Sequence, residues 1–197
     1  MSVQLPISRG EVILIRHGET AWSRSGQHTG LTDMALTEQG SEAAKALTPL
    51  LAGFDFSLVL SSPLQRATVT CQLAGLGDSM HLEPDLVEWN YGDYEGMTSA
   101  EIERLSPGWL VFNDGCPGGE SPEAVGERVD RVVDTVRSQE GQVALFAHGH
   151  VLRVFIARWL GLAPKAGAHF LLDTSTLNIL SYYKGVPAVK CWNAAVN

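Results

Sequence analysis

Two histidines each follow a short apolar stretch and precede a glycine. His17 follows the segment 11–16 (EVILIR), and His148 follows the segment 142–147 (QVALFA). A lone histidine at such a place is more often a hydrogen-bonded structural residue than a catalyst. Here, however, a neutral imidazole could act as a nucleophile, and the neighbouring Arg16 carries a planar fork of donors that suits phosphate. The pairing indicates phosphoryl transfer chemistry.

Other chemically capable residues lie in polar motifs after further apolar segments. Arg66 occurs in SSPLQRAT (61–68), and Glu88 occurs in LVEWNYG (86–92). Several such groups are needed, because a rate gain approaching ~10²¹ on a phosphate monoester corresponds to about 28 kcal/mol. One cation at 4 Å from a phosphate charge supplies only about 4 kcal/mol at an effective dielectric constant of 20. Two arginines and a protonated or hydrogen-bond-donating histidine therefore form a sensible minimum set.

The elements that must position these residues alternate between strand and helix. The predicted strands cover 11–16, 57–60, 142–147, 176–183 and 186–192, with a weak strand near His81. The predicted helices cover 37–54, 62–73, 98–105, a long segment from Ser121 onward, and a segment that includes 151–159. This pattern predicts an α/β fold of three layers, α/β/α, with a mostly parallel central sheet.

The boundaries of these helices depend on local signals. Ser62-Pro63 and Ser121-Pro122 each offer a capping hydroxyl and a proline suited to the first helical turn. Four residues of the first helix fall on one apolar stripe: Ala43, Leu47, Leu50 and Leu51. Four valines of the long helix do the same: Val125, Val129, Val132 and Val136. We expect the valine stripe to be buried, and the first helix to be a crossover between strands.

The whole chain, 1–197, is predicted to form one domain, with a cap-like segment at about 75–117 that is rich in turn residues. Ligands of such sheets bind outside the carboxyl ends of the strands. Both His17 and His148 are predicted to lie there.

The composition excludes several classes of protein. A net charge of −8 argues against general affinity for nucleic acid or for an anionic membrane surface. Three widely spaced cysteines indicate neither a disulfide framework nor a zinc site, and we expect no metal or other cofactor. The first ten residues lack an apolar targeting segment, and no apolar run is long enough to span a bilayer, so a cytoplasmic location is expected.

Four motifs together resemble the histidine phosphatase superfamily, in its phosphoglycerate mutase-like branch, and most of all its broad-specificity acid phosphatases. They are LIRHGET (14–20), SSPLQRAT, LVEWNYGDYEG (86–96) and FAHGH (146–150). The resemblance runs from Glu11 to about Ser181. It implies that His17 becomes a phosphohistidine, with its second ring nitrogen held by a backbone carbonyl such as that of Gly18.

The same resemblance assigns the other catalytic roles. Arg16, Arg66 and His148 would surround the phosphate, and Glu88 would donate a proton to the leaving group. The apolar neighbours Val87 and Trp89 should favour the neutral acid.

The residues expected to contact substrate lie mainly in the segment 23–33 (SRSGQHTGLTD). They are Ser23, His28, Thr29, Gly30, Tyr91 and Gly149. Gly18 and Gly149 lack a Cβ, so the backbone there could turn sharply and approach phosphate closely. Glu120 and Ser121 are candidate supporting partners, although a helix cap accounts for Ser121 by itself.

The function expected is hydrolysis of a small phosphorylated metabolite. A sugar bisphosphatase would need another basic contact, for which Arg24 and Arg153 are candidates. A phosphoglycerate mutase would need several basic residues after the general acid, and 96–117 contains only Arg104. A phosphoprotein phosphatase and a non-enzymatic binder of phosphorylated ligands are further alternatives, and an exposed last strand would allow a homodimer.

Overall fold

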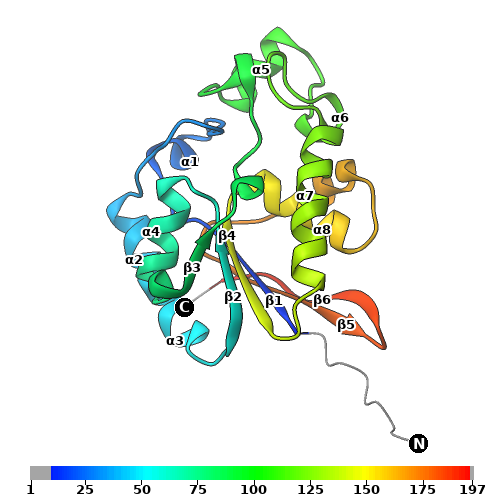
Figure 1. The fold of residues 1–197 in the computed structure, drawn as a ribbon. Coiled ribbons are helices and arrows are strands. Elements are labelled where there is room, and N and C mark those ends of the chain that lie inside the picture. The colour runs from blue at the N-terminus through cyan, green and yellow to red at the C-terminus, as the bar shows by residue number, and fades with distance from the viewer. Residues whose placement is uncertain (1–9, 196–197) are drawn as a thin grey trace, which may run out of the picture.

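A six-stranded sheet forms the centre of the computed structural model, which describes residues 10–195 (Figure 1). The strands are β1 (Val12–Arg16), β2 (Phe56–Ser61), β3 (Met80–Leu82), β4 (Gln142–Ala147), β5 (Leu177–Tyr183) and β6 (Val186–Ala194). Their order is β3-β2-β4-β1-β5-β6. The first four are mutually parallel, whereas β5 and β6 join antiparallel. The prediction of a mostly parallel sheet is confirmed.

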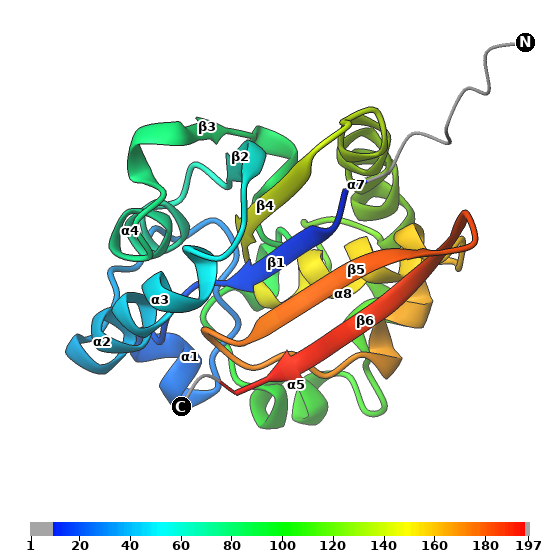
Figure 2. The ribbon, with the colours of Figure 1, turned by 90° about the horizontal axis from the view of Figure 1, so that it is seen from below.

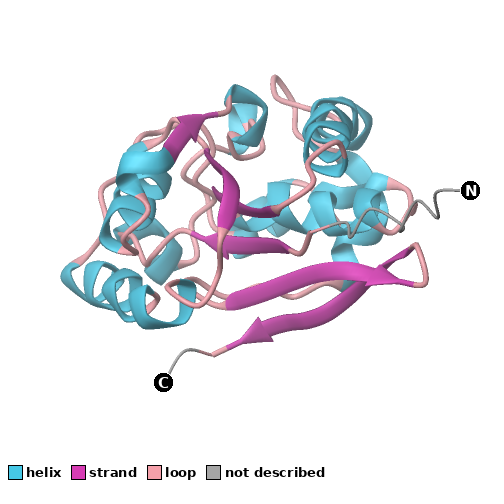
Figure 3. Cartoon of the chain, turned by 60° about the horizontal axis from the view of Figure 1, so that its bottom comes forward, coloured by secondary structure: helices cyan, strands magenta, loops and turns pink. Residues whose placement is uncertain are grey.

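Helices cover both faces of this sheet. They are α1 (Ala21–Ser25), α2 (Glu38–Ala46), α3 (Thr48–Leu51), α4 (Gln65–Leu73), α5 (Ser99–Leu105), α6 (Val111–Asp114), α7 (Pro122–Arg137) and α8 (Gly149–Trp159). Figure 2 shows α2, α3 and α4 on one side and α7 and α8 on the other, and Figure 3 shows the same layers by type of structure. The three-layer arrangement is therefore as predicted.

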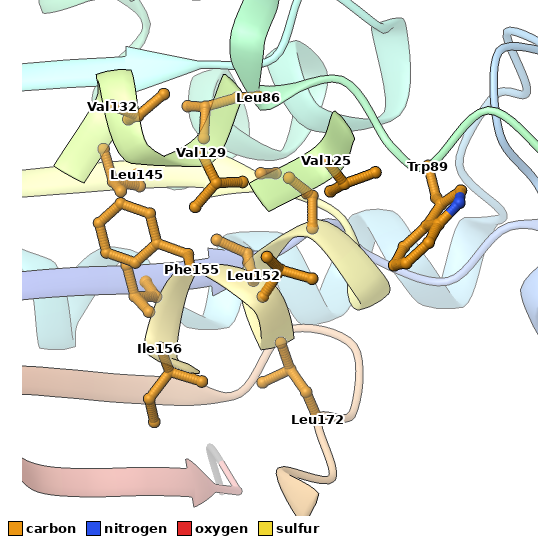
Figure 4. Packing of buried hydrophobic residues seen from close by; sticks show 14 of the residues in the cluster. Leu86, Trp89, Val125, Val129, Val132, Leu145, Leu152, Phe155, Ile156 and Leu172 are labelled. Atoms are coloured by element: carbon orange, nitrogen blue, oxygen red, sulfur yellow. The ribbon is translucent and has the colours of Figure 1, made fainter. Parts of the chain in front are cut away.

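Strand periodicity divides the core into two clusters. In β1, Ile13 and Ile15 face α2, α3 and α4, while Val12 and Leu14 face α7 and α8. All four side chains are buried, which is why this strand is apolar without interruption. The larger cluster packs α7 and α8 onto the sheet (Figure 4), and the four valines predicted for the buried face of α7 are all buried.

The predicted helix over 37–54 is interrupted. It divides into α2 and α3 near Leu47, because Pro49 has no N–H with which to continue the hydrogen-bond ladder. Of the four stripe residues, Leu47 and Leu51 are buried, Ala43 is partly buried and Leu50 is 40% exposed, so the stripe does not continue across the break.

The predicted start of the helix at Ser62 is also wrong. Helix α4 begins at Gln65, with Leu64 as its extended N-cap residue. The Ser62 hydroxyl is instead hydrogen-bonded to the ring of His148. By contrast, Ser121 caps α7 as predicted, because its hydroxyl accepts the backbone N–H of Ala124 at 3.1 Å.

The segment from 92 to 117, which contains α5 and α6, gathers at one end of the molecule (Figure 1). The loop that contains α1 is joined to it by backbone hydrogen bonds. His28 N–H donates to the Met97 carbonyl at 2.9 Å, and Gly96 N–H donates to the His28 carbonyl at 2.8 Å. These bonds close one side of the region beyond the strand ends.

Strand β6 lies at an edge of the sheet, as expected for the last strand. The homodimer that this edge would allow stays a prediction. Between residues 10 and 195, no helix combines the length and the apolar character required to cross a bilayer.

We predict that Leu152→Ala lowers the free energy of unfolding by 2–5 kcal/mol, because Leu152 is fully buried between α8 and the sheet (Figure 4). Chemical denaturation measures this change. Leu105→Ala is the matched control, since Leu105 is 68% exposed and its truncation should cost less than about 0.5 kcal/mol. Equal costs for the two variants would contradict the assignment of α8 to the core.

Candidate active site

The carboxyl ends of β1 and β4 bring the two histidines together. The strands pair with Arg16 opposite Ala147, and the N–H of His17 donates to the Ala147 carbonyl at 2.9 Å. The rings of His17 and His148 then lie 5.1 Å apart between centroids. Residues far apart in the chain are thus adjacent at the edge where parallel sheets bind ligands.

His17 is held as a neutral imidazole in one tautomer. Its Nδ1 lies 2.7 Å from the Gly18 carbonyl, which can only accept, so Nδ1 carries the proton and Nε2 keeps a lone pair. Burial, reinforced by the charges of Arg16 and Arg66, lowers the pKa of His17 well below its usual range. An uncharged ring with a free nitrogen is the form that can attack phosphorus.

Arg16 has a donor free for a ligand. One terminal nitrogen donates to the Leu172 carbonyl at 2.6 Å, whereas its Nε is buried and has no partner among the described residues. Burial lowers the pKa of Arg16 and the charge of Glu88 opposes this, but a guanidinium stays charged in proteins. An unpaired buried N–H beside a cavity favours an anionic oxygen as its partner.

Gly149 allows Arg16 to occupy this place. A Cβ at Gly149 would lie 3.3 Å from the Arg16 guanidinium. Gly18 serves a different purpose from the one expected, because a Cβ there would lie 2.4 Å from the Gly40 carbonyl. The close approach at Gly18 is thus to the backbone that begins α2.

Arg66 is fully buried, and most of its N–H groups are hydrogen-bonded to other groups of the protein. Its Nε donates to His148 Nδ1 at 3.0 Å, and its terminal nitrogens donate to the carbonyls of Thr29, Gly30 and Thr32. Four of the five donors of a guanidinium are therefore engaged. Arg66 holds both the second histidine and the loop that follows α1.

His148 is likewise neutral. Because Arg66 donates to its Nδ1, the ring proton is on Nε2, which lies 2.7 Å from the Ser62 hydroxyl. Burial, with the charge of Arg66 second in effect, lowers the pKa of His148 well below its usual range. The positive charge next to the two histidines is thus carried by Arg16 and Arg66.

Glu88 is 4% exposed and lies against the amino end of α8. One of its oxygens accepts the N–H groups of Trp89 and Val151, and the other accepts that of His150, all at 2.9 Å. Two of these three donors belong to the first turn of α8, so the carboxyl group of Glu88 is held between its own segment and the helix. The expectation that apolar neighbours favour the neutral acid stays a prediction.

A cavity of about 220 Å³ opens beside His17. Its described lining residues are Arg16, His17, Ser23, Gly26, Gln27, His28, Thr29, Glu88, Tyr91, Ser99, Gly149, His150, Arg153 and Leu172. Arg66 and His148 are buried next to His17 without lining the cavity. Within residues 10–195 no group of three or more histidine, cysteine or acidic side chains could hold a metal ion.

Comparison with known proteins agrees with this geometry. The model of the histidine phosphatase superfamily (branch 1) matches residues 12–195. The chain belongs to the histidine phosphatase superfamily. It is similar to an acid phosphatase of Mycobacterium tuberculosis, with 38% identity over 89% of this chain and 88% of that protein.

Two further similarities support the same conclusion. A sedoheptulose 1,7-bisphosphatase of Saccharomyces cerevisiae is 35% identical over 94% of this chain and 80% of that protein. A solved structure from Mycobacterium tuberculosis superposes with a TM-score of 0.90 at 36% identity, and covers 95% of this chain and 99% of that chain. This histidine phosphatase is a phosphoric monoester hydrolase.

Five of the six residues predicted to contact substrate line the cavity of this phosphatase, and Gly30 does not. The N–H of Gly30 donates to the Glu95 carboxylate, and a Cβ at Gly30 would lie 2.5 Å from the Trp89 carbonyl. Gly30 therefore shapes the loop.

Sequence analysis missed His150, although it quoted the FAHGH motif that contains it. Burial raises the pKa of Tyr91 and lowers that of His150, so the Tyr91 hydroxyl donates to His150 Nδ1 and the proton of the ring is on Nε2. The spacing of His150 and Arg153, three residues apart on α8, was the available signal, because it puts both on one helix face.

Arg153 and Arg24 were the two candidates for an additional basic contact. Arg153 lines the cavity, where its guanidinium lies 4.5 Å from the centre of the Phe112 ring. Arg24 is exposed and forms an ion pair with Glu19.

We predict that the unliganded phosphatase loses stability as the pH falls from 8 to 5, in part through His17. The pKa of His17 is depressed in the folded protein, so only the unfolded chain takes up a proton near its ordinary value of about 6.5, and the contribution is lost as the pH drops below that value. At pH 5 the loss of stability that comes from His17 should amount to about 2 kcal/mol. Urea denaturation at both pH values should show a smaller loss for His17→Asn, and an identical loss would contradict a buried neutral His17.

Proposed function

We propose that this phosphatase hydrolyses small-molecule phosphate monoesters through a phosphohistidine on His17, with Glu88 as the proton donor. The observation that carries this proposal is the neutral His17 ring, whose Nε2 lone pair lines the same cavity as the unpartnered Nε of Arg16. A nucleophile and a cationic donor are thus available to one phosphoryl group.

The proposed reaction has two balanced steps. In the first, Nε2 of His17 forms a bond to phosphorus, the ester P–O bond breaks, and the departing oxygen takes a proton from Glu88 to leave as an alcohol. In the second, water attacks phosphorus, the P–N bond breaks, and the proton of the water passes to the Glu88 carboxylate. Inorganic phosphate departs, and His17 and Glu88 return to their starting forms.

Arg16 is proposed to bind the phosphoryl oxygens directly. Arg66 and His148 support the phosphate site from behind, since Arg66 is already bound to His148 and to the loop carbonyls. Ser23, His28, Thr29, Tyr91 and Gly149 line the cavity in which the alcohol portion of the ester would lie.

A mutase is less well supported than a phosphatase. Arg104, the single basic residue of 96–117, is exposed on α5 and is absent from the cavity lining. A phosphoglycerate carboxylate would thus have no cation from the cap segment.

One observation favours sugar bisphosphates as a second candidate class of substrate. Arg153 lines the same cavity as His17, and among the described residues its hydrogen bonds run only from its Nε and one terminal nitrogen, to the carbonyls of Gly167 and Ala168. Its remaining donors could receive a second phosphate group. The yeast relative named as a bisphosphatase is consistent with this class.

We predict that His17→Ala abolishes phosphate release while the fold is retained, because it removes the nucleophile that shares the cavity with the unpartnered Nε of Arg16. The assay is phosphate release from sugar phosphates, phosphoglycerates, nucleotides and p-nitrophenyl phosphate, with quenching in alkaline denaturant to trap labelled phosphoenzyme in the wild type, because the P–N bond of phosphohistidine is stable to base and labile in acid. Phosphoenzyme formation in wild type alone is expected. Turnover by His17→Ala near the wild-type rate would exclude the covalent route.

We predict that Arg153→Met lowers kcat/KM for sugar bisphosphates about tenfold or more, because a charge-assisted hydrogen bond contributes roughly 1.5–3 kcal/mol. The kcat/KM for monophosphates should change less than about threefold, because these substrates have no second phosphate group for Arg153 to bind. Arg24→Met is the matched control and should leave both classes unchanged. A similar loss for both classes of substrate would remove the case for a second phosphate site.

A further inference from the structure

Arg128 is a buried cation outside the cavity, and every one of its donors is used. It lies on α7 and is 7% exposed. Its Nε and one terminal nitrogen bind the two carboxylate oxygens of Glu120 at 2.8 and 3.0 Å. The other terminal nitrogen donates to the carbonyls of Asp85 and Val87, both at 2.7 Å, and the fifth donor reaches the Glu88 carbonyl at 3.2 Å.

Glu120 holds the other side of the same segment. Its carboxylate accepts the N–H of Asn90 at 2.8 Å, and its backbone carbonyl accepts the indole N–H of Trp89 at 3.0 Å. The N–H of Glu120 in turn donates to the Asn90 carbonyl at 2.9 Å. The backbone on both sides of Glu88 is therefore attached to one ion pair.

This attachment matters because the segment 87–91 has no regular structure of its own. It lies between two 3₁₀ turns, 84–86 and 92–94, and belongs to no strand or helix. A buried carbonyl without a donor costs roughly 1–3 kcal/mol, so the path of this segment depends on the donors that Arg128 supplies. The carboxylate of Glu88 is separately held by α8, at 2.9 Å from each N–H.

We propose that Arg128, together with Glu120, is the positioning residue that sets where Glu88 delivers its proton. The inference rests on the proposed role of Glu88. Arg128 fixes the main chain of Glu88, and α8 fixes its carboxyl group. Together these two attachments fix the position of the Glu88 side chain at the cavity wall.

Lysine cannot replace Arg128 in this role. A lysine ammonium keeps the charge near Glu120 but cannot direct five N–H groups in a plane to a carboxylate and three carbonyls. Arg128→Lys should therefore let the Glu88 segment shift, although the charge of the site is unchanged.

The test compares a substrate that needs a proton donor with one that does not. Alkyl phosphates release a strongly basic oxygen, whereas p-nitrophenyl phosphate releases a stable phenolate. We would measure kcat/KM on both for Glu88→Gln, Arg128→Lys, Glu120→Gln and the double variant Arg128→Lys/Glu88→Gln. Arg131→Lys is the matched control, because Arg131 lies on the same helix and forms an exposed bidentate pair with the Asp85 carboxylate.

We expect Glu88→Gln to lose about 100-fold or more on the alkyl ester, in the range ordinary for general acid catalysis. Arg128→Lys and Glu120→Gln should lose about tenfold or more on that ester and less than about threefold on p-nitrophenyl phosphate. The double variant should be no slower than Glu88→Gln alone, since both changes remove one function. Arg131→Lys should match the wild type on both substrates.

Other results separate the two ideas. If Arg128→Lys lost activity equally on the two substrates, or if the losses in the double variant were additive, the positioning role of Arg128 would be overturned and Glu88 would remain the proton donor. The absence of any leaving-group effect in Glu88→Gln would overturn both. Thermal unfolding of each variant identifies one that does not fold, and the isosteric Glu120→Gln then carries the test.

Discussion

The pairing of β1 with β4 is the constraint on which the site depends. Between these strands the chain forms α1 to α7 and two other strands, yet the register that sets Arg16 opposite Ala147 makes both strands end at one level. The hydrogen bond from His17 to the Ala147 carbonyl extends this pairing by one residue. A slip of one residue would send the side chain of Arg16 to the other face of the sheet and separate the two histidines.

Burial at this edge determines how charge is distributed. Four groups that could be cationic lie together: Arg16, Arg66, His17 and His148. The cost of removing charge from water keeps both histidines neutral. The charge of Glu88 raises the pKa of Arg16 and of Arg66 and partly offsets their burial. The guanidinium groups of Arg16, Arg66 and Arg153 then carry the positive charge near His17, so a chain of net charge −8 still presents a local attraction for an anion.

The parts of the fold that were predictable depend on local patterns. Apolar runs that end in His-Gly indicated β1 and β4, and Ser121-Pro122 marked the start of α7. Where tertiary contacts decide, local patterns were insufficient. Ser62 carries a capping signal but its hydroxyl is bound to His148, and Arg128 appears in sequence as an ordinary residue of an amphipathic helix. The inward direction of Arg66 likewise depends on loop carbonyls that no spacing reveals.

The amino end of α8 gives Glu88 a particular role. A helix N-terminus after a parallel strand is a ready site for phosphate, but here the N–H groups of His150 and Val151 are occupied by the Glu88 carboxylate. In the proposed mechanism, phosphate therefore binds at Arg16, and the amino end of α8 holds the carboxyl group of Glu88 in place at the cavity wall. The same carboxyl group gives up a proton in the first proposed step and accepts one in the second. A fixed place at the amino end of α8 would thus serve both steps of the proposed reaction.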